Sequence, residues 1–149
     1  MLAGFVLSTL AVGIIAGSVT APNIPGWYAG LAKPGFNPPN WVFAPVWTTL
    51  YFVMAIAAWR VWCKTGWRNA SIALWLAQLA LNFCWSFLFF GAHAVLAALL
   101  DVGLLWLALV ATMIAFWRID KPAGWLFVPY LAWVSFAGIL NAAILKLNG

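Results

Sequence analysis

Long stretches without a charged residue constrain the fold of this chain more than any other feature of its sequence. A helix that crosses a bilayer core about 30 Å thick needs roughly 20 mostly apolar residues. Four uncharged stretches reach that length, namely 1–32, 34–59, 69–100 and 122–145. A fifth uncharged stretch, 102–117, is shorter. Only 6% of the residues are charged and 67% are hydrophobic, whereas globular proteins have about 25% and 45–50%. We therefore expect a membrane protein rather than a soluble domain.

The short stretch can span a bilayer if it is extended back through Asp101 to about Val95. The sequence then predicts an all-α integral membrane protein, a five-transmembrane-helix bundle that forms a single domain over 1–149. The expected helices cover about 4–21, 41–62, 69–90, 95–117 and 123–145. Ten-residue blocks of alternating apolar and polar positions, which are typical of a membrane β-barrel, are absent from the sequence.

A secretory signal peptide is the alternative interpretation of residues 1–21. The small residues Val19, Thr20 and Ala21 suit a cleavage site. However, no Lys or Arg precedes the apolar region, and this region is longer than a usual signal core. A first transmembrane helix is therefore the better prediction.

The basic residues predict the orientation of the chain in the membrane. Five of the seven fall between helices two and three or between helices four and five, namely Arg60, Lys64, Arg68, Arg118 and Lys121. Lys33 and Lys146 fall on the opposite side. Because cytoplasmic loops are rich in Lys and Arg, we expect the N-terminus in the cytoplasm and the C-terminus outside, in a bacterial cytoplasmic membrane rather than an outer membrane. These topology signals account for the net charge of +5, so nucleic-acid binding is not expected.

The connection between the first two helices, about 22–40, carries five of the eight prolines. Proline restricts the backbone, and Trp27, Tyr28, Leu31 and Phe36 supply apolar area that can dock on another surface. Two interpretations fit this composition: a loop that lies on lipid head groups, or a lid over a cavity. Composition alone does not favour one of them.

Three tryptophans are expected to lie below the level of the head groups. Trp47 follows Trp41 by six residues and Trp133 follows Trp125 by eight, so they lie roughly 9 and 12 Å deeper along their helices. An indole N–H in hydrocarbon needs an acceptor, so such side chains usually face the bundle interior. Packing is the common explanation for one deep tryptophan. Two of them, together with Trp85 of the third helix, predict an aromatic-lined pocket.

Polar side chains within the expected helices have either a structural or a functional role. Gln78, Asn82 and Trp85 stand at i, i+4 and i+7 and share one face of the third helix. They either hold helices together or contact a ligand. Asp101, about two turns into the fourth helix, is likewise a structural group or a functional acid. The single histidine, His93, falls in the turn before that helix and is expected to be solvated.

Five motifs are spread along the chain: Trp27-Tyr28-x-x-Leu31-x-Lys33-Pro34, Pro38-Pro39-x-Trp41-Val42-Phe43-x-Pro45-Val46-Trp47-Thr48-x-Leu50-Tyr51, Gln78-Leu79-Ala80-Leu81-Asn82-x-x-Trp85, Phe89-Phe90-Gly91 and Pro129-Tyr130-Leu131-Ala132-Trp133. Together they resemble the translocator protein family, whose members are also called tryptophan-rich sensory proteins or peripheral benzodiazepine receptors. The resemblance covers essentially the whole chain. It implies a five-helix bundle, usually dimeric, that binds porphyrins such as protoporphyrin and, in animal members, cholesterol and benzodiazepine-type drugs.

The resemblance also implies which residues bind the ligand. Carried over by position, they are Trp47, Asn82, Trp133, Ala137 and Leu140, with Tyr28, Leu31 and Pro38 approaching from the loop. The family's sterol motif needs a Tyr between a Leu or Val and a basic residue at the end of helix five. Residues 140–146 contain no Tyr, which weakens the case for sterol binding through this motif.

The small number of acidic and histidine residues limits the chemistry that this chain can perform. The chain has two acids and one histidine, so conventional hydrolytic or acid–base catalysis, a metal site and bis-histidine haem ligation are not expected, and no cofactor is obligatory. We expect a receptor or sensor that binds porphyrin between helices one, two and five under the 22–40 loop, with Lys33 near the porphyrin propionates. The alternatives are a transporter of porphyrin or another amphipath, and an enzyme that degrades porphyrin in light through Trp47 and Trp133.

Small residues recur in two helices and suggest where helices approach each other closely. Gly13 and Gly17 form a small-x-x-x-small pattern in the first helix. The third helix carries a row of alanines at i, i+3, i+7 and i+10, namely Ala70, Ala73, Ala77 and Ala80. This row has the spacing of a left-handed seam. We therefore assign the alanine row to a homodimer and the two glycines to packing within one protomer.

Overall fold

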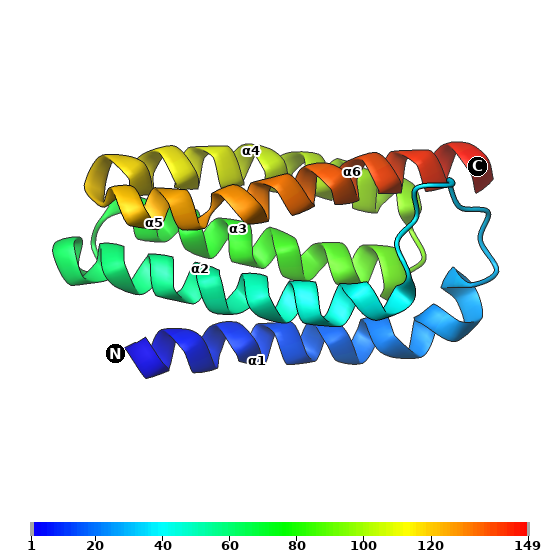
Figure 1. Ribbon diagram of the computed structural model, residues 1–149, viewed down its shortest axis with the longest axis horizontal. Coiled ribbons are helices and arrows are strands. Elements are labelled where there is room, and N and C mark those ends of the chain that lie inside the picture. The colour runs from blue at the N-terminus through cyan, green and yellow to red at the C-terminus, as the bar shows by residue number, and fades with distance from the viewer. Residues whose placement is uncertain (1, 149) are drawn as a thin grey trace.

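The computed structural model describes residues 2–148, and every regular element in that part of the chain is a helix. Five apolar helical segments are long enough to cross a membrane (Figure 1): Leu2–Tyr28, Asn40–Thr65, Ala70–Gly91, Val95–Ile119 and Lys121–Asn148. Their α-helical parts are α1 (Leu2–Thr20), α2 (Phe43–Thr65), α3 (Ala70–Ser86), α4 (Val95–Ile119), the short α5 (Lys121–Leu126) and α6 (Val128–Asn148). The predicted all-α fold with five membrane helices is confirmed.

The first helical segment is longer than predicted. A 3₁₀ turn, Ala21–Asn23, and a π turn, Ile24–Tyr28, continue α1, so the irregular part of the predicted 22–40 connection starts after Tyr28. A proline occupies the first turn of each of these two segments. Because proline lacks the N–H that a continuing α-helix needs, these two prolines coincide with the change from α to 3₁₀ and then π geometry.

Two further membrane segments contain a 3₁₀ or π turn, and the last segment consists of two α-helices. A 3₁₀ turn, Asn40–Val42, leads into α2, and a π turn, Phe87–Gly91, follows α3. The predicted helix 123–145 is interrupted at Phe127, which separates α5 from α6. The π turn after α3 carries two buried phenylalanines that take part in the site described below.

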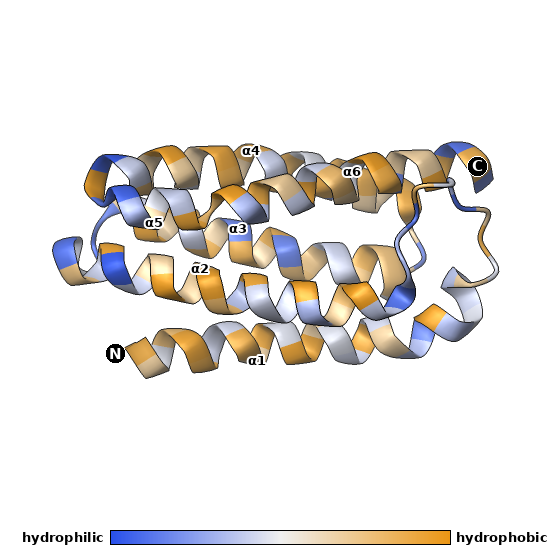
Figure 2. Ribbon diagram, in the orientation of Figure 1, coloured by the Kyte–Doolittle hydropathy of each residue, from blue (hydrophilic) through white to orange (hydrophobic). Residues whose placement is uncertain are grey.

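Successive membrane segments run antiparallel along one long axis, with α1 against α2, α3 against α4 and α4 against α6 (Figure 1). One end of the bundle, which we call the loop end, holds the α1–α2 connection, the α3–α4 turn and the C-terminus. The other, which we call the basic end, holds the start of α1 and the α2–α3 and α4–α5 connections, with the five basic residues Arg60, Lys64, Arg68, Arg118 and Lys121. Hydrophilic residues gather at these ends, and hydrophobic ones cover the helices between them (Figure 2).

An ion cluster around Asp120 joins α2 to the α4–α5 connection at the basic end. The carboxylate is buried and accepts from Arg60 Nε at 2.6 Å, Lys64 Nζ at 2.8 Å and the backbone N–H of Ala123 at 3.1 Å. Its hydrogen bond with Arg60, helped by those with Lys64 and Ala123, lowers the pKa of Asp120 well below its usual value. Asp120 therefore caps α5 and fixes α2 to the end of α4.

We expect Asp120→Asn to lower the free energy of unfolding by about 2 kcal/mol at pH 7, because the amide loses both ionic partners. A depressed pKa stabilises the fold above the unfolded-state pKa of about 3.9, and this contribution is lost as the pH falls through the folded-state pKa. The difference between wild type and variant should therefore shrink below about pH 4. Reversible unfolding in mixed detergent micelles at several pH values measures this, and a difference that is constant with pH would contradict the assignment.

Candidate ligand-binding site

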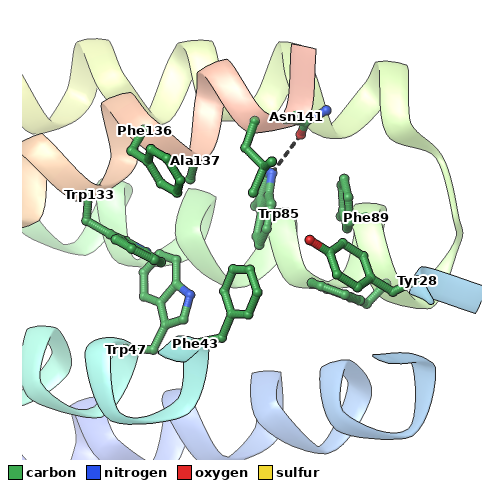
Figure 3. Close-up of a pocket in the computed structure, with 11 residues that line it drawn as sticks. Tyr28, Phe43, Trp47, Trp85, Phe89, Trp133, Phe136, Ala137 and Asn141 are labelled. Carbon is green, nitrogen blue, oxygen red and sulfur yellow. Dashed lines mark hydrogen bonds between the residues drawn. The ribbon is translucent and has the colours of Figure 1, made fainter. Parts of the chain in front are cut away.

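Aromatic side chains from several spans enclose a small space toward the loop end, which we call the aromatic box (Figure 3). Trp47 of α2 and Trp133 of α6 meet edge to face, with ring centroids 6.3 Å apart and planes at 87°. Phe43, one turn before Trp47, lies 6.0 Å from the Trp133 ring, and Phe136 lies 5.4 Å from it. The two deep tryptophans that the sequence singled out thus lie together.

Five of the residues implied by the resemblance line the aromatic box, namely Tyr28, Trp47, Trp133, Ala137 and Leu140. The other lining residues are Phe43, Trp85, Phe89, Phe90, Phe136 and Asn141. Trp85 of α3, which the sequence also assigned to an aromatic pocket, is among them, and the π turn after α3 adds Phe89 and Phe90 to a pocket predicted between helices one, two and five. Helical spacing could have found two of the missed residues, since Phe43 precedes Trp47 by four positions and Phe136 follows Trp133 by three.

The aromatic box is closed in this conformation. Its volume is about 10 Å³, which is roughly the space that one water molecule needs. Pockets that hold drug-sized ligands have volumes of about 300–1,000 Å³. A ligand as large as a tetrapyrrole can enter only if some of the aromatic side chains move.

Two indole N–H groups of the aromatic box differ in their partners. Trp85 Nε1 donates to Asn141 Oδ1 at 3.0 Å, and Asn141 Nδ2 in turn donates to the Val95 carbonyl at 3.1 Å (Figure 3). Trp133 Nε1 is buried and has no acceptor among the described residues. A buried donor without an acceptor costs free energy, so a ligand that presents an acceptor to Trp133 gains this hydrogen bond without breaking another.

A second, larger space lies between α1 and α2, and we call it the groove. A Cβ added at Gly13 would lie 2.8 Å from the Tyr51 ring, so the two helices touch there. A Cβ added at Gly17, one turn further, meets no atom within 4 Å. The helices separate beyond Gly13 and leave a groove of about 440 Å³. Ile14, which lines the groove, is 73% exposed, so the groove opens on the outer face of the bundle.

Four aromatic side chains line both spaces, namely Phe43, Trp47, Trp85 and Phe90. We call them the partition, because they separate the aromatic box from the groove. The indole of Trp85 is held by its hydrogen bond to Asn141, whereas the indole of Trp47 in α2 has no hydrogen-bond partner among the described residues. A movement of the Trp47 side chain would therefore join the two spaces into one cavity of ligand size.

Asn82, which the resemblance placed at the ligand, lies instead in a buried hydrogen-bond network beside the site. Its Oδ1 accepts from Tyr51 OH at 2.8 Å, and its Nδ2 donates to Tyr130 OH. Tyr130 OH then donates to Gln78 Oε1 at 3.0 Å. These four side chains come from α2, α3 and α6 and are nearly inaccessible. Of the two roles that the sequence left open, the structure favours holding helices together for both Gln78 and Asn82.

The α1–α2 connection is tied down at several points. Tyr28 OH donates to Asn37 Oδ1 at 2.6 Å. Asn148, in the last turn of α6, accepts from the Ala32 N–H at 2.9 Å and donates to the Ala32 carbonyl at 2.8 Å. Tyr28 belongs to the lining of the aromatic box, but Leu31 and Pro38 line neither space. These contacts place the connection over the loop end of the bundle.

Lys33 organises this connection rather than offering a free charge. Its ammonium donates to the carbonyls of Tyr28, Leu31 and Ala29 at 2.8, 3.0 and 3.3 Å. An ammonium has three donors, so all of them are used by the backbone. An anionic ligand group could pair with Lys33 only in competition with these backbone carbonyls.

The remaining polar candidates lie outside both spaces. Asp101 is buried in α4, and its Oδ2 has no partner among the described residues. His93 is exposed, stacks on Trp27 with ring centroids 4.2 Å apart and has its Nε2 3.1 Å from Asn23 Oδ1. Within residues 2–148, no three His, Cys, Asp or Glu side chains gather where they could hold a metal ion.

Comparison with known proteins identifies the family. The model of the TspO/MBR family matches residues 5–147. The tryptophan-rich protein TspO of Chlorobaculum tepidum is 50% identical over 144 residues, which cover 93% of this chain and 90% of that protein. The tryptophan-rich protein TspO of Archaeoglobus fulgidus is 42% identical over 96% of this chain and 94% of its own, and the human translocator protein is 40% identical over 82% and 75%. The resemblance found in the sequence motifs is thereby confirmed, and the chain belongs to the TspO/MBR family.

Proposed function

We propose that this protein is a membrane receptor or sensor that binds a porphyrin across the aromatic box and the groove. The observation that carries the proposal is the partition, because four aromatic side chains separate a closed box from an open groove of about 440 Å³. A flat apolar macrocycle suits such walls, since aromatic rings favour stacked and edge-to-face contacts. The relative from Cereibacter sphaeroides, 48% identical over 82% of this chain, bears the name tryptophan-rich sensory protein.

The polar groups of the site restrict how the ligand would sit. The buried N–H of Trp133 favours an acceptor on the inner part of the ligand. Charged groups such as propionates would stay at the loop end in contact with water, because the ammonium of Lys33 is already used. No further cofactor is part of this proposal. Benzodiazepine-type drugs are proposed as further ligands of the same aromatic surface, and sterol is not proposed, because 140–146 lacks the motif tyrosine.

Titration of the purified protein with protoporphyrin, followed by quenching of intrinsic tryptophan fluorescence, tests the proposal. Saturable quenching is expected, because Trp47, Trp85 and Trp133 lie in the lining. Unquenched fluorescence of the lining tryptophans at saturating porphyrin would contradict it. A water-soluble anionic dye of similar absorbance controls for inner-filter effects.

Two other functions use the same site and differ in the fate of the bound porphyrin. The name translocator protein, carried by the human relative, favours a transporter, and porphyrin flux into sealed vesicles would identify one. The contact between Trp47 and Trp133 favours light-dependent degradation with dioxygen as the oxidant, since an excited porphyrin sensitises oxygen and a nearby indole can donate electrons. Loss of the porphyrin spectrum in light but not in the dark, after subtraction of free porphyrin bleaching, would identify that enzyme.

We also propose an orientation in a bacterial cytoplasmic membrane. The basic end carries Arg60, Lys64, Arg68, Arg118 and Lys121, and the loop end carries Lys33 and Lys146. The positive-inside rule then places the basic end and the N-terminus in the cytoplasm, with the C-terminus outside. Ligand would reach the site from the outer leaflet, where the groove and the loop end lie.

A homodimer through α3 completes the proposal. The alanine row faces outward, since Ala70, Ala73, Ala77 and Ala80 are all exposed or half-buried. Cys84 and Phe87, which continue the same spacing toward the loop end, are exposed as well. A second copy could therefore approach the backbone of α3 closely along much of its length.

Enlarging Ala73 and Ala77 together to Leu should give a monomer in detergent that still binds protoporphyrin, because neither residue lines the site. Size-exclusion chromatography with light scattering measures the mass. Oxidation of Cys84 between chains, in a Cys63→Ser background, gives an independent readout of the same face. If the double variant remains a dimer, or if Cys84 never forms a cross-link between chains, the dimer interface does not lie on this face of α3.

A further inference from the structure

A second aromatic cluster surrounds Phe5, near the start of α1. The start of α1 and the α2–α3 connection lie at the basic end of the bundle, opposite the loop end (Figure 1). Phe5 of α1 is its centre and is 3% exposed. The Phe5 ring lies 5.9 Å from Trp62 of α2, 5.4 Å from Trp67 of the α2–α3 connection and 5.7 Å from Trp75 of α3. We call these four residues the Phe5 cluster. The function proposed above does not use it.

The Phe5 cluster contains two buried donors without acceptors. Trp62 Nε1 and Trp75 Nε1 are both inaccessible and have no hydrogen-bond partner among the described residues. Two other indoles of the described residues do donate, Trp85 to Asn141 Oδ1 at 3.0 Å and Trp106 to Ser135 Oγ at 2.9 Å. Two unpaired donors around one ring make this cluster suited to a molecule that brings its own acceptors.

The cover of the Phe5 cluster belongs to a connection rather than to a helix. Trp67 is 56% exposed and lies flat on Phe5, with their planes at 15°. It follows Gly66, whose φ of 73° lies in the left-handed region that favours glycine. Trp67 lies between α2 and α3 and belongs to neither, so turning its side chain away from Phe5 would require no change in the helices.

The basic residue next to this cover is unpaired within residues 2–148, whereas the two basic residues before it in α2 share one carboxylate. Arg60 and Lys64 both pair with Asp120. Arg68 follows Trp67 directly, is exposed and has no ion-pair partner among the described residues. Arg118 and Lys121 are exposed as well, but they lie where α4 ends and α5 begins. An anionic group bound beside Trp67 would therefore have Arg68 as the basic residue adjacent in sequence.

We infer that the Phe5 cluster binds the head-group region of one anionic phospholipid. The cluster lies where α2 ends at Thr65 and α3 begins at Ala70, which is the level at which membrane helices meet lipid head groups. The phosphate pairs with Arg68, and the ester carbonyls accept from the indoles of Trp62 and Trp75 once Trp67 has turned aside. The acyl chains then run along the outer flank of α1, where Leu7 is 68% exposed.

Native mass spectrometry of the full-length protein in detergent tests this inference with dioleoylphosphatidylglycerol as the probe. The double variant Trp62→Phe/Trp75→Phe keeps both aromatic rings and removes both donors. We expect its dissociation constant for phosphatidylglycerol to rise at least tenfold. The control Trp106→Phe/Trp125→Phe removes two indoles elsewhere, both in exposed positions, and should bind like wild type. Equal affinity of wild type and of Trp62→Phe/Trp75→Phe for phosphatidylglycerol would overturn the inference. The indole N–H groups of Trp62 and Trp75 would then have only the faces of neighbouring aromatic rings as partners.

Two further variants keep the inference testable if the double variant does not fold. Trp67→Ala removes the cover and should raise the affinity for phosphatidylglycerol several-fold, whereas an unchanged or lower affinity would overturn the role of Trp67 as a cover. Arg68→Gln should abolish the preference for phosphatidylglycerol over dioleoylphosphatidylcholine. A preference that survives this change would overturn the pairing of the phosphate with Arg68. Inorganic phosphate at millimolar concentration should not compete, because it lacks the ester carbonyls.

Discussion

Trp133→Ala should weaken protoporphyrin binding about 30-fold, which corresponds to about 2 kcal/mol of lost burial and aromatic contact. Trp133 contacts Trp47, Phe43 and Phe136, so its removal takes away a central wall of the aromatic box. Its indole N–H is also a buried donor without an acceptor among the described residues. Fluorescence titration of the variant measures the loss, and size-exclusion chromatography confirms that the bundle still folds.

Trp133→Phe separates the ring from its N–H. This variant keeps an aromatic wall and should lose about 1 kcal/mol, or roughly fivefold in affinity, if the ligand accepts from the indole. Trp125→Ala is the matched control, because Trp125 belongs to the same span but is 60% exposed and lines neither space. If the Trp133→Ala variant binds protoporphyrin with wild-type affinity, the aromatic box is not part of the binding site.

The two glycines of α1 should give opposite results when each is replaced by Leu. At Gly13 a new side chain meets the Tyr51 ring at 2.8 Å, so Gly13→Leu forces α1 away from α2 and should destabilise the fold by about 3 kcal/mol. At Gly17 the new side chain meets nothing within 4 Å and fills the groove. Gly17→Leu should therefore keep the thermal stability of wild type and lower porphyrin affinity at least tenfold.

Gly4→Leu is the control for this pair, because Gly4 also lies in α1 and a Cβ added there meets nothing within 4 Å. It shares the gain in helix propensity that any Gly→Leu change brings, but it lies far from the groove lining. Thermal unfolding and porphyrin titration of the three variants are compared side by side. If Gly17→Leu binds porphyrin like Gly4→Leu, the groove is not part of the binding site.

The number and type of the helices could be predicted, because hydrocarbon tolerates few charges and the uncharged stretches are long. The helix ends could not be predicted equally well. Pro22 and Pro25 indicated an irregular connection, yet both occupy first turns of short helical segments that carry the chain to Tyr28. Such placement depends on how the next residues pack, and Tyr28 is buried against Phe43 and Phe90.

The site was predictable to the extent that depth and helical spacing determine it. Trp47 and Trp133 were found because they lie below the level of head groups, and both line the aromatic box. The position of Asn82 was not predictable, because spacing shows which face of α3 it shares but not what that face meets. Its partners Tyr51 and Tyr130 lie 31 and 48 residues away in sequence. The groove depends on where α1 and α2 separate, which a pattern of glycines alone does not reveal.

The structure of the complex with protoporphyrin tests the central claim most directly. The account predicts that the macrocycle lies in contact with Trp133, that the Trp47 side chain has moved, and that the aromatic box and the groove have become one cavity. Porphyrin bound on the outer surface of α3 or α4, with the aromatic box still closed at about 10 Å³, would contradict it.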